Sequence, residues 1–390
     1  MCNTILPASV DLILKTLENA GHSAYAVGGC VRDILRGVTP DDYDITTSAL
    51  PDEVITLFGD DAIPTGLKHG TVTVKSNGMK CEVTTYRAEG NYSDHRRPDE
   101  VCFVTDVKDD LSRRDFTMNA IALSRHGEYI DPFNGIEDIK NKIIRCVGDA
   151  ETRFNEDTLR MFRALRFSAT LNFTIDKATL SAIINCAPLA KYIAVERITV
   201  ELQKALLGQN TLPLEHMFAY GLADSYISES CEPDFSKLTA IPRDITMRLC
   251  AMCWILEKRG SINTSEFLQR LRCSNETVKL CSLGVVGAKA HPASRLEWKQ
   301  LIAQTGFPAA RCAAAALITE GNSYFDLIDE IQNSGECCSL STLAINGNDI
   351  TALGVSGQNV GIELKRALEY VIEHPDRNSK SELINFIINR

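Results

Sequence analysis

The chain has 390 residues, of which 44% are hydrophobic, and a formal net charge of −10 at pH 7. This length predicts about two to four packed units with real cores. The negative charge excludes a protein that binds polyanions through its overall charge, so any contact with nucleic acid must come from local basic patches. No apolar run approaches the ~20 residues that a membrane helix needs, so we expect no membrane association.

The 14 cysteines are scattered along the chain, and many stand in apolar runs. This distribution is typical of buried, reduced thiols in a cytosolic protein. Cys250 and Cys253 form a C-x-x-C pair, but no second pair stands at zinc spacing, so we interpret them as part of a core helix. The N-terminal segment lacks the basic start of a signal peptide. These features predict a cytoplasmic protein.

The first part of the chain mixes helical and β-type patterns. A helical pattern covers residues 9–20 and ends at Gly21. Short β-type runs then alternate with helical patterns, which predicts a small α/β head over residues 1–148. The β-type runs are residues 24–27, 42–45, 71–74, 80–86, 121–123 and 127–131, and the helical patterns between them include 29–37 and 51–59.

From residue 149 the apolar residues recur at helical spacing. We expect an all-α continuation, divided into a neck over residues 149–205 and a body and tail over residues 206–390. The clearest helical patterns of the neck are residues 156–170, 176–188 and 195–208. Helical patterns continue from there to the C-terminus with only short breaks.

The motif GGCVRD, residues 28–33, follows a β-type run and opens a helical pattern. Gly28 and Gly29 let a backbone approach a phosphate closely, and a helix N-terminus adds amide donors. Arg32 suits a charge-assisted contact with a triphosphate, and Asp33 would hold that arginine or cap the helix. A Gly-Gly turn before a helix is common, so this motif alone is a weak signal.

The stretch DDYDITT, residues 41–47, places Asp42 and Asp44 two positions apart in a β-type run. Residues i and i+2 of a strand point to the same face, and two such carboxylates repel each other. A divalent cation such as Mg²⁺ relieves that repulsion, because it binds carboxylates together with substrate phosphates. Two solvated aspartates on an edge strand are the alternative interpretation.

GGCVRD followed nine residues later by D-x-D resembles the active-site signature of polymerase-β-like nucleotidyltransferases. RRDFTMNA (113–120) and NEDTLRMFRALRF (155–167) follow in order. Together they resemble the class II tRNA nucleotidyltransferases, or CCA-adding enzymes, and the bacterial poly(A) polymerases. The resemblance covers residues 24–205, and residues 343–368 resemble the C-terminal segment of CCA-adding enzymes.

The resemblance implies that Asp42 and Asp44 bind two catalytic Mg²⁺ ions. Glu82, in the run 80–86, is a candidate third catalytic carboxylate, or else an ordinary edge-strand acid. CTP and ATP are the implied substrates, and tRNA is the implied partner, held by its shape through the helical body and tail. The implied nucleotide-binding residues of the head are Gly28, Gly29, Arg32, Asp33, Arg114, Asp115 and Asn119.

In the neck, the resemblance implies that Asp157 and Arg160 read the base, with Arg163 and Arg166 continuing towards the phosphates. The spacing of three places these residues near one helix face. An ionised aspartate accepts hydrogen bonds and an arginine donates them. Cytosine and adenine both present an amine beside a ring nitrogen acceptor, so one pair could match both bases. An ordinary surface ion pair is the alternative.

Two further segments carry implied roles. Residues 86–101 form a polar stretch typical of a mobile loop, and they resemble the family's flexible loop for adding the terminal A. His95 departs from the small residue that is usual in that loop. Residues 131–139, DPFNGIEDI, resemble the segment whose movement accompanies the switch from C to A. Its alternative is a plain turn, with Pro132 and Gly135 as ordinary turn residues.

The predicted function is therefore the template-independent addition of CCA to the 3′ end of tRNA, by two-metal nucleotidyl transfer from CTP and ATP. A poly(A) polymerase and an A-adding enzyme partnered with a CC-adding one are close alternatives. Residues 341–390 hold five lysines and arginines against six acidic residues, so no basic extension of the poly(A) polymerase kind is visible. An inactive tRNA-binding protein would not need Asp42, Asp44 and Glu82. The sequence does not predict the oligomeric state.

Overall fold

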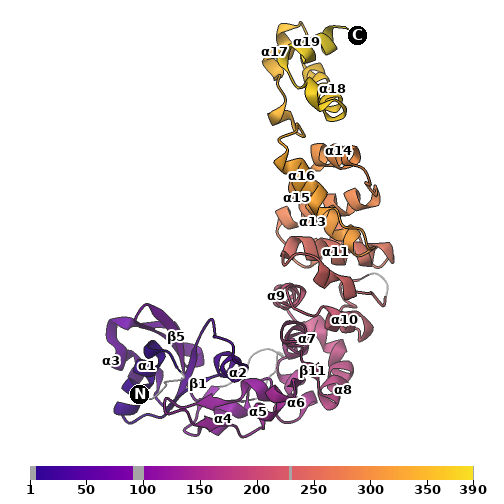
Figure 1. The fold of residues 1–390 in the computed structure, drawn as a ribbon. Coiled ribbons are helices and arrows are strands. Elements are labelled where there is room, and N and C mark those ends of the chain that lie inside the picture. The colour runs from indigo at the N-terminus through magenta and orange to yellow at the C-terminus, as the bar shows by residue number, and fades with distance from the viewer. Residues whose placement is uncertain (1–5, 91–100, 228–230, 390) are drawn as a thin grey trace. The chain divides into compact units, whose positions relative to one another are not determined.

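A computed structural model describes residues 6–90, 101–227 and 231–389 of the chain (Figure 1). The chain forms two compact units. The first unit runs to Glu201 and also includes Tyr220–Ser225, while the second comprises Leu202–Ala219 and the chain from Tyr226 onward. Two expected boundaries remain predictions: the one between head and neck at residue 148, and the one between neck and body at residue 205.

The first unit is built on a seven-stranded sheet with the strand order β3-β4-β5-β2-β1-β8-β9. β2 runs parallel to β5, and every other neighbouring pair in this sheet is antiparallel. This mixed sheet confirms the α/β head. The strands are β1 (Ala24–Val27), β2 (Asp44–Thr47), β3 (Ala62–Gly66), β4 (Thr71–Ser76), β5 (Met79–Thr85), β8 (Ala122–Leu123) and β9 (Tyr129–Ile130).

The two faces of β4 and β5 differ because successive side chains of a strand point to opposite sides. One face packs against the helices α1 (Ala8–Asn19) and α3 (Pro51–Phe58). The other face carries threonine, lysine and glutamate side chains that are partly or fully exposed. The sheet therefore has one covered face and one open face in this region. The buried residues on the covered face are Val72, Val74, Cys81 and Val83.

Short elements complete the head around β1. A core cluster that includes Val27, Tyr86 and Leu111 connects the sheet to α4. A separate hairpin is formed by β6 and β7, and β10 pairs in parallel with β11. These elements are α2 (Gly29–Leu35), β6 (Arg87–Glu89), β7 (Val101–Phe103), α4 (Val107–Ser112), η3 (Thr117–Asn119), α5 (Gly135–Lys140), β10 (Ile143–Ile144) and β11 (Thr174–Ile175).

The segment predicted as the neck is mainly helical, with one interruption that the periodicity did not reveal. Its helices are α6 (Ala150–Glu156), α7 (Leu159–Leu171), α8 (Lys177–Cys186) and α9 (Val195–Leu206). The expectation of a continuous helix over residues 156–170 is wrong, because Asp157 has an extended backbone with φ −130° and ψ 99°. The short strand β11 was also not expected, since two residues carry no periodic signal.

Several helices of the second unit begin at capping side chains. Asp244, Asn263 and Ser274 each accept a hydrogen bond from a backbone N–H in the first turn of the helix that follows. Such caps satisfy donors that have no partner within the helix. The helices are α10 (Glu215–Ala219), α11 (Ile245–Lys258), α12 (Thr264–Arg270), α13 (Asn275–Lys289), α14 (Arg295–Thr305), α15 (Phe307–Ile318), α16 (Phe325–Asn333), α17 (Gly347–Ala352), α18 (Gln358–Glu373) and α19 (Lys380–Ile388).

Small side chains allow α11, α13 and α15 to pack closely. A Cβ added at Gly284 of α13 would lie 2.6 Å from the Cβ of Cys312 and 2.7 Å from the Sγ of Cys250. Cys250 and Cys253 are fully buried on α11, which confirms that this C-x-x-C pair belongs to a core helix. All cysteines in the described part of the chain are free thiols.

The guanidinium group of Arg248 binds the end of α9 within the second unit. Its Nη1 donates to the carbonyl oxygens of Leu206 and Gly208, and its Nε and Nη2 donate to that of Ile241. The last carbonyl groups of a helix lack partners within the helix, so this buried arginine satisfies them. Within residues 6–90, 101–227 and 231–389, no helix has the length and apolar character to cross a membrane.

The close packing at Gly284 predicts a specific loss of stability. Replacing Gly284 with Ala should lower the free energy of unfolding by about 2 kcal/mol, because the methyl group has no space beside Cys250 and Cys312. Gly361 of α18 has nothing within 4 Å of an added Cβ and provides the matched control. Gly361→Ala should raise the free energy of unfolding by about 0.5–1 kcal/mol. Denaturant unfolding followed by circular dichroism measures both, and equal effects would contradict the packing argument.

Candidate active site

The predicted carboxylates come together at the junction of β2 and β5. Asp44 is the first residue of β2, and its partner in the parallel register is Glu82 of β5. Asp42 lies two residues before the strand, so the expectation that β2 spans residues 42–45 is wrong. Desolvation by the surrounding protein, together with the charges of Asp42 and Glu82, raises the pKa of Asp44 to about 6, although Arg114 opposes this shift.

This group of carboxylates has the chemistry of a divalent cation site. The repulsion between neighbouring carboxylates is relieved when a cation binds between them. In the part of the chain that the structure describes, no three His, Cys, Asp or Glu side chains are arranged to hold a metal ion by themselves. A cation at Asp42 and Asp44 would thus need further oxygen ligands, and Mg²⁺ commonly takes these from substrate phosphates and water.

Gly28 lies between Asp44 and Arg114. Its φ of 81° and ψ of −132° favour glycine, and an added Cβ would lie 3.3 Å from Nη1 of Arg114 and 3.8 Å from Oδ2 of Asp44. The Nε atom of Arg114 is buried and has no hydrogen-bond partner among the described residues. The backbone at Gly28 therefore leaves the carboxylate and the guanidinium group next to each other.

Four residues predicted to bind the nucleotide form one hydrogen-bonded chain. Arg32 donates to both carboxylate oxygens of Asp33 and, at 2.8 Å, to Oδ1 of Asn119. Asn119 in turn donates to Oδ1 of Asp115 at 3.1 Å. The chain joins α2 to η3, and it places side chains that are 87 positions apart in the sequence in direct contact.

Asp115 extends this network to α7. Nε and Nη2 of Arg163 donate to Oδ2 of Asp115 at 2.8 and 2.6 Å. Burial by itself would raise the pKa of Asp115, but Arg163 and Asn119 outweigh it and lower that pKa to about 2. The carboxylate is thus ionised at neutral pH and keeps Arg163 oriented.

Asp110 of α4 is a fully buried residue that was not predicted from the sequence. It accepts hydrogen bonds from Arg113, from Arg114 and from the Thr46 hydroxyl of β2. Burial opposes ionisation, but Arg114 and Arg113 hold the pKa of Asp110 below its ordinary value. The i, i+3 and i, i+4 spacing between Asp110 and the two arginines was the available sequence signal.

Asp157 and Arg160, which were predicted to read the base, pair with different residues. Asp157 lies between α6 and α7 and accepts hydrogen bonds from Nη2 of Arg197 at 3.1 and 3.2 Å. Arg160 is buried and donates to Glu156 and to the backbone oxygens of Arg153 and Arg113. The prediction that Asp157 and Arg160 share a helix face is wrong, because Asp157 itself has an extended backbone and α7 begins only at Leu159.

Arg163 and Arg166 of α7 bind different carboxylates, but both lie over the ring of Phe167. Arg163 binds Asp115, whereas Arg166 donates to Glu201 at 2.8 Å and lies over the ring of Phe167, 3.5 Å from its centroid. Glu201, Arg197 and Phe167 were not predicted. The signal for the first two was their i, i+4 spacing in α9, which ordinarily indicates only a surface pair.

Of the two segments with implied mobile roles, the structure describes all of residues 131–139 but only part of residues 86–101. Most of the expected flexible loop, including His95, lies outside the described residues. In the segment 131–139, the carboxylate of Asp131 accepts the N–H groups of Gly135 and Ile136 at the start of α5. The interpretation of Gly135 as an ordinary turn residue is wrong, because an added Cβ would collide with the carbonyl oxygen of Thr117.

Two family models match parts of the chain. The model described as "Poly A polymerase head domain" matches residues 24–145. The model described as "Probable RNA and SrmB- binding site of polymerase A" matches residues 172–231. These two ranges include every predicted carboxylate of the sheet but not the segment that contains Asp157 and the arginines of α7.

Relatives extend the similarity over the whole chain. The CCA-adding enzyme of Lactiplantibacillus plantarum is 36% identical over 401 residues, which cover 99% of this chain and 98% of that protein. The CCA-adding enzyme of Leuconostoc mesenteroides subsp. mesenteroides is 54% identical over 196 residues, covering 50% of this chain and 49% of that protein. The structure of the Bacillus stearothermophilus CCA-adding enzyme in complex with CTP is 30% identical, with a TM-score of 0.81, and covers 98% of this chain and 96% of that one.

The contacts of Asp110 predict that its buried charge stabilises the positions of Arg113, Arg114 and Thr46 next to the site. Asp110→Asn should lower the free energy of unfolding by about 2 kcal/mol, because two arginines lose a buried carboxylate partner. Asp109→Asn is the matched control, since Asp109 is the exposed neighbour on the same helix, and it should change stability by less than about 0.5 kcal/mol. Thermal and denaturant unfolding of both variants decide the point. Equal stability of the two would show that Asp110 does not anchor the arginines.

Proposed function

The chain belongs to the family of CCA-adding enzymes, and we propose that Asp42, Asp44 and Glu82 form its catalytic centre. The protein is a CCA tRNA nucleotidyltransferase, which adds CCA to the 3′ end of tRNA from CTP and ATP. The observation that supports this centre most strongly is the register of β2 on β5, which brings Asp44 beside Glu82.

Asp42 and Asp44 would hold two Mg²⁺ ions. The raised pKa of Asp44 indicates that the protein alone leaves these carboxylates incompletely neutralised. Two such ions would activate the 3′-hydroxyl of the RNA and stabilise the leaving pyrophosphate. Glu82 is the third carboxylate at this point of the sheet, and its place next to Asp44 favours a catalytic role over that of an edge-strand acid.

The head residues around this centre would bind and orient the nucleoside triphosphate. Arg114 brings positive charge next to Asp44, and Gly28 leaves space for a phosphate to approach both. Arg32 already donates to Asp33 and Asn119, so we assign it the role of positioning the backbone at Gly29. Fixing these groups before the substrate binds reduces the reorganisation that the reaction requires.

Asp157 and Arg160 would select the base, as their motif in the family implies. A carboxylate accepts from the exocyclic amine of cytosine or adenine, whereas uracil and guanine present a carbonyl oxygen at that position. Arg197 holds both oxygens of Asp157, so it would orient this carboxylate towards the base. Arg160 is buried in its present contacts and would have to exchange them to reach a ring nitrogen.

The helical second unit would hold the tRNA by its shape, since duplex RNA is recognised mainly through its backbone. We place the reaction in the cytoplasm, because all the described cysteines are free thiols, which is typical of a reducing compartment.

Primer extension tests the function and its centre together. With Mg²⁺, CTP and ATP, the protein should add three nucleotides to tRNA that lacks CCA and then stop. Asp42→Ala and Asp44→Ala should each reduce incorporation by at least about 1000-fold, because the cation loses a carboxylate ligand, while tRNA binding persists. Removal of divalent ions with EDTA should have the same effect on the unmodified protein.

The other outcomes of the same gel are equally specific. Addition only to tRNA ending in CC, with ATP alone, would make the protein an A-adding enzyme. Long products on unstructured RNA with ATP would make it a poly(A) polymerase. Full activity of Asp44→Ala would reject the proposed metal site.

Base selection gives a separate prediction. Asp157→Ala should reduce discrimination against UTP and GTP by about 10- to 100-fold, because the site loses its acceptor for the exocyclic amine. Glu196→Ala, an exposed acidic residue of α9, is the control and should keep the discrimination of the unmodified protein. Single-nucleotide incorporation from each of the four nucleoside triphosphates measures both. Unchanged selection in Asp157→Ala would mean that other residues read the base.

A further inference from the structure

The β4–β5 hairpin carries two lysines directly opposite each other. Lys75 and Lys80 are partners in the antiparallel register, and both are exposed. Like charges at opposed positions destabilise a pair of strands. Among residues 6–90, 101–227 and 231–389, neither lysine has an ion-pair or hydrogen-bond partner. The hairpin thus keeps an unneutralised pair of positive charges in a chain whose net charge is −10.

The two lysines lie on the same face of the sheet as the catalytic carboxylates. Lys80 and Glu82 are two positions apart in β5, so their side chains point to the same side. Asp44 is the partner of Glu82 on β2, which continues this face. The Cα atoms of Lys80 and Glu82 are separated by about 7 Å along the strand.

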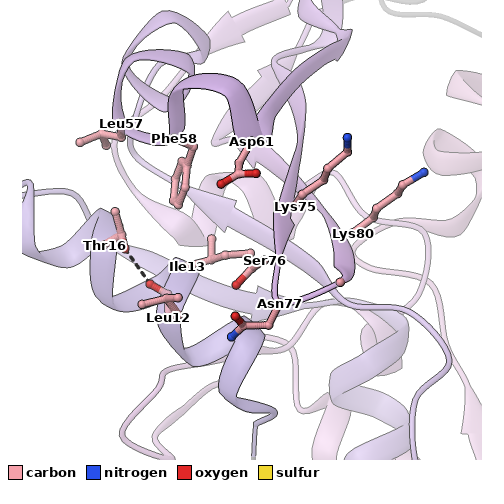
Figure 2. Close-up of a pocket in the computed structure, with 11 residues that line it drawn as sticks. Leu12, Ile13, Thr16, Leu57, Phe58, Asp61, Lys75, Ser76, Asn77 and Lys80 are labelled. Carbon is pink, nitrogen blue, oxygen red and sulfur yellow. Dashed lines mark hydrogen bonds between the residues drawn. The ribbon is translucent and has the colours of Figure 1, made fainter.

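The close-up of the hairpin agrees with this assignment of faces. Figure 2 shows the side chains of Lys75 and Lys80 extending to the side of the hairpin opposite the Ser76 hydroxyl. Ser76 instead extends towards α1. A groove of about 510 Å³ lies beside the turn of the hairpin, and its lining includes Lys75, Ser76 and Lys80 together with residues of α1 and Asp61. The ammonium groups are therefore directed towards the open face of the sheet.

Hydroxyl groups occupy the rest of this open face. Thr71 and Thr84 are hydrogen-bonded to each other through their Oγ1 atoms at 3.0 Å, and Thr73 is similarly bonded to Thr65 at 2.8 Å. Each hydroxyl keeps further donor or acceptor capacity. The surface from Asp44 to the turn of the hairpin is thus polar and, at its far end, positively charged.

We propose that this hairpin track, defined as Thr71, Thr73, Lys75, Lys80 and Thr84, binds the sugar–phosphate backbone of the RNA near its 3′ end. The inference rests on the proposed function, because that reaction must bring an RNA 3′-hydroxyl to Asp44 and Glu82. Phosphates would neutralise the two lysines, and the threonine hydroxyls suit contacts with ribose.

The strand order separates this track from the nucleotide side of the site. Gly28 follows β1 and lies beside Arg114, and β1 neighbours β2 on one side. β5 and β4, which carry the lysines, neighbour β2 on the other side. The triphosphate at Gly28 and the RNA on the hairpin track would therefore approach the carboxylates from opposite sides, as an in-line transfer between them requires.

The test compares Lys75→Ala/Lys80→Ala with Lys15→Ala/Lys108→Ala. The control removes the same charge from exposed lysines of α1 and α4. In the track variant, the KM for tRNA lacking CCA should rise about five- to tenfold, while the KM for CTP and ATP and the kcat at saturating tRNA stay the same. The dependence of log Kd for tRNA on log salt should become shallower by about 1.4, from two lost phosphate contacts to a single strand.

The melting temperature of Lys75→Ala/Lys80→Ala separates a role in RNA binding from a structural role. Removing two opposed like charges should leave the melting temperature unchanged or slightly higher, whereas a structural role would lower it. Lys75→Arg/Lys80→Arg keeps the charges and should retain the tRNA affinity of the unmodified protein.

Three results would overturn the proposal. A higher KM for CTP and ATP with an unchanged KM for tRNA would assign the lysines to the triphosphate. An equal rise of the KM for tRNA in the control variant would show that any exposed lysine contributes as much as the two of the track. An unchanged salt dependence of the Kd for tRNA would exclude phosphate contacts. Failure of the unmodified protein to add CCA would instead reject the proposed function. The assay of the unmodified protein therefore distinguishes this outcome from a failure of the hairpin-track proposal.

Discussion

The parallel pairing of β2 with β5 is the constraint on which the rest of the site depends. It sets Asp44 beside Glu82, while the next pair, Ile45 and Val83, is buried on the opposite face. A slip of one residue would bury a carboxylate and expose an apolar side chain, so the hydrophobic face fixes the register. The same apolar residues that stabilise the head thereby hold the acidic side chains at the open face.

Buried carboxylates organise the arginines around this face. Asp110 holds Arg113 and Arg114 next to β2, and Asp115 holds Arg163 of α7. A buried charge is tolerated only when it is paired and hydrogen-bonded, and each of these carboxylates accepts bonds from several groups. Because Asp115 has a pKa of about 2, its attraction for Arg163 does not vary across the physiological pH range.

The two faces of the β4–β5 hairpin have different roles in the first unit. Its valines and Cys81 pack beneath α1 and α3, and its threonines and lysines face solvent beside the carboxylates. This division follows directly from the two-residue period of a strand. The same hairpin therefore stabilises the core on one side and, in our proposal, binds RNA on the other.

The sequence by itself determined the motifs, the mixed head followed by helices, and the residues Asp42, Asp44 and Glu82, because local spacing and hydrophobic period carry that information. It did not reveal that Asp157 ends a helix and binds Arg197, 40 positions away, or that Asp110 anchors Thr46 across 64 positions. Only the tertiary structure decided these contacts. A buried charge takes the partner that the packing of distant elements brings within hydrogen-bond distance, and no local pattern records that choice.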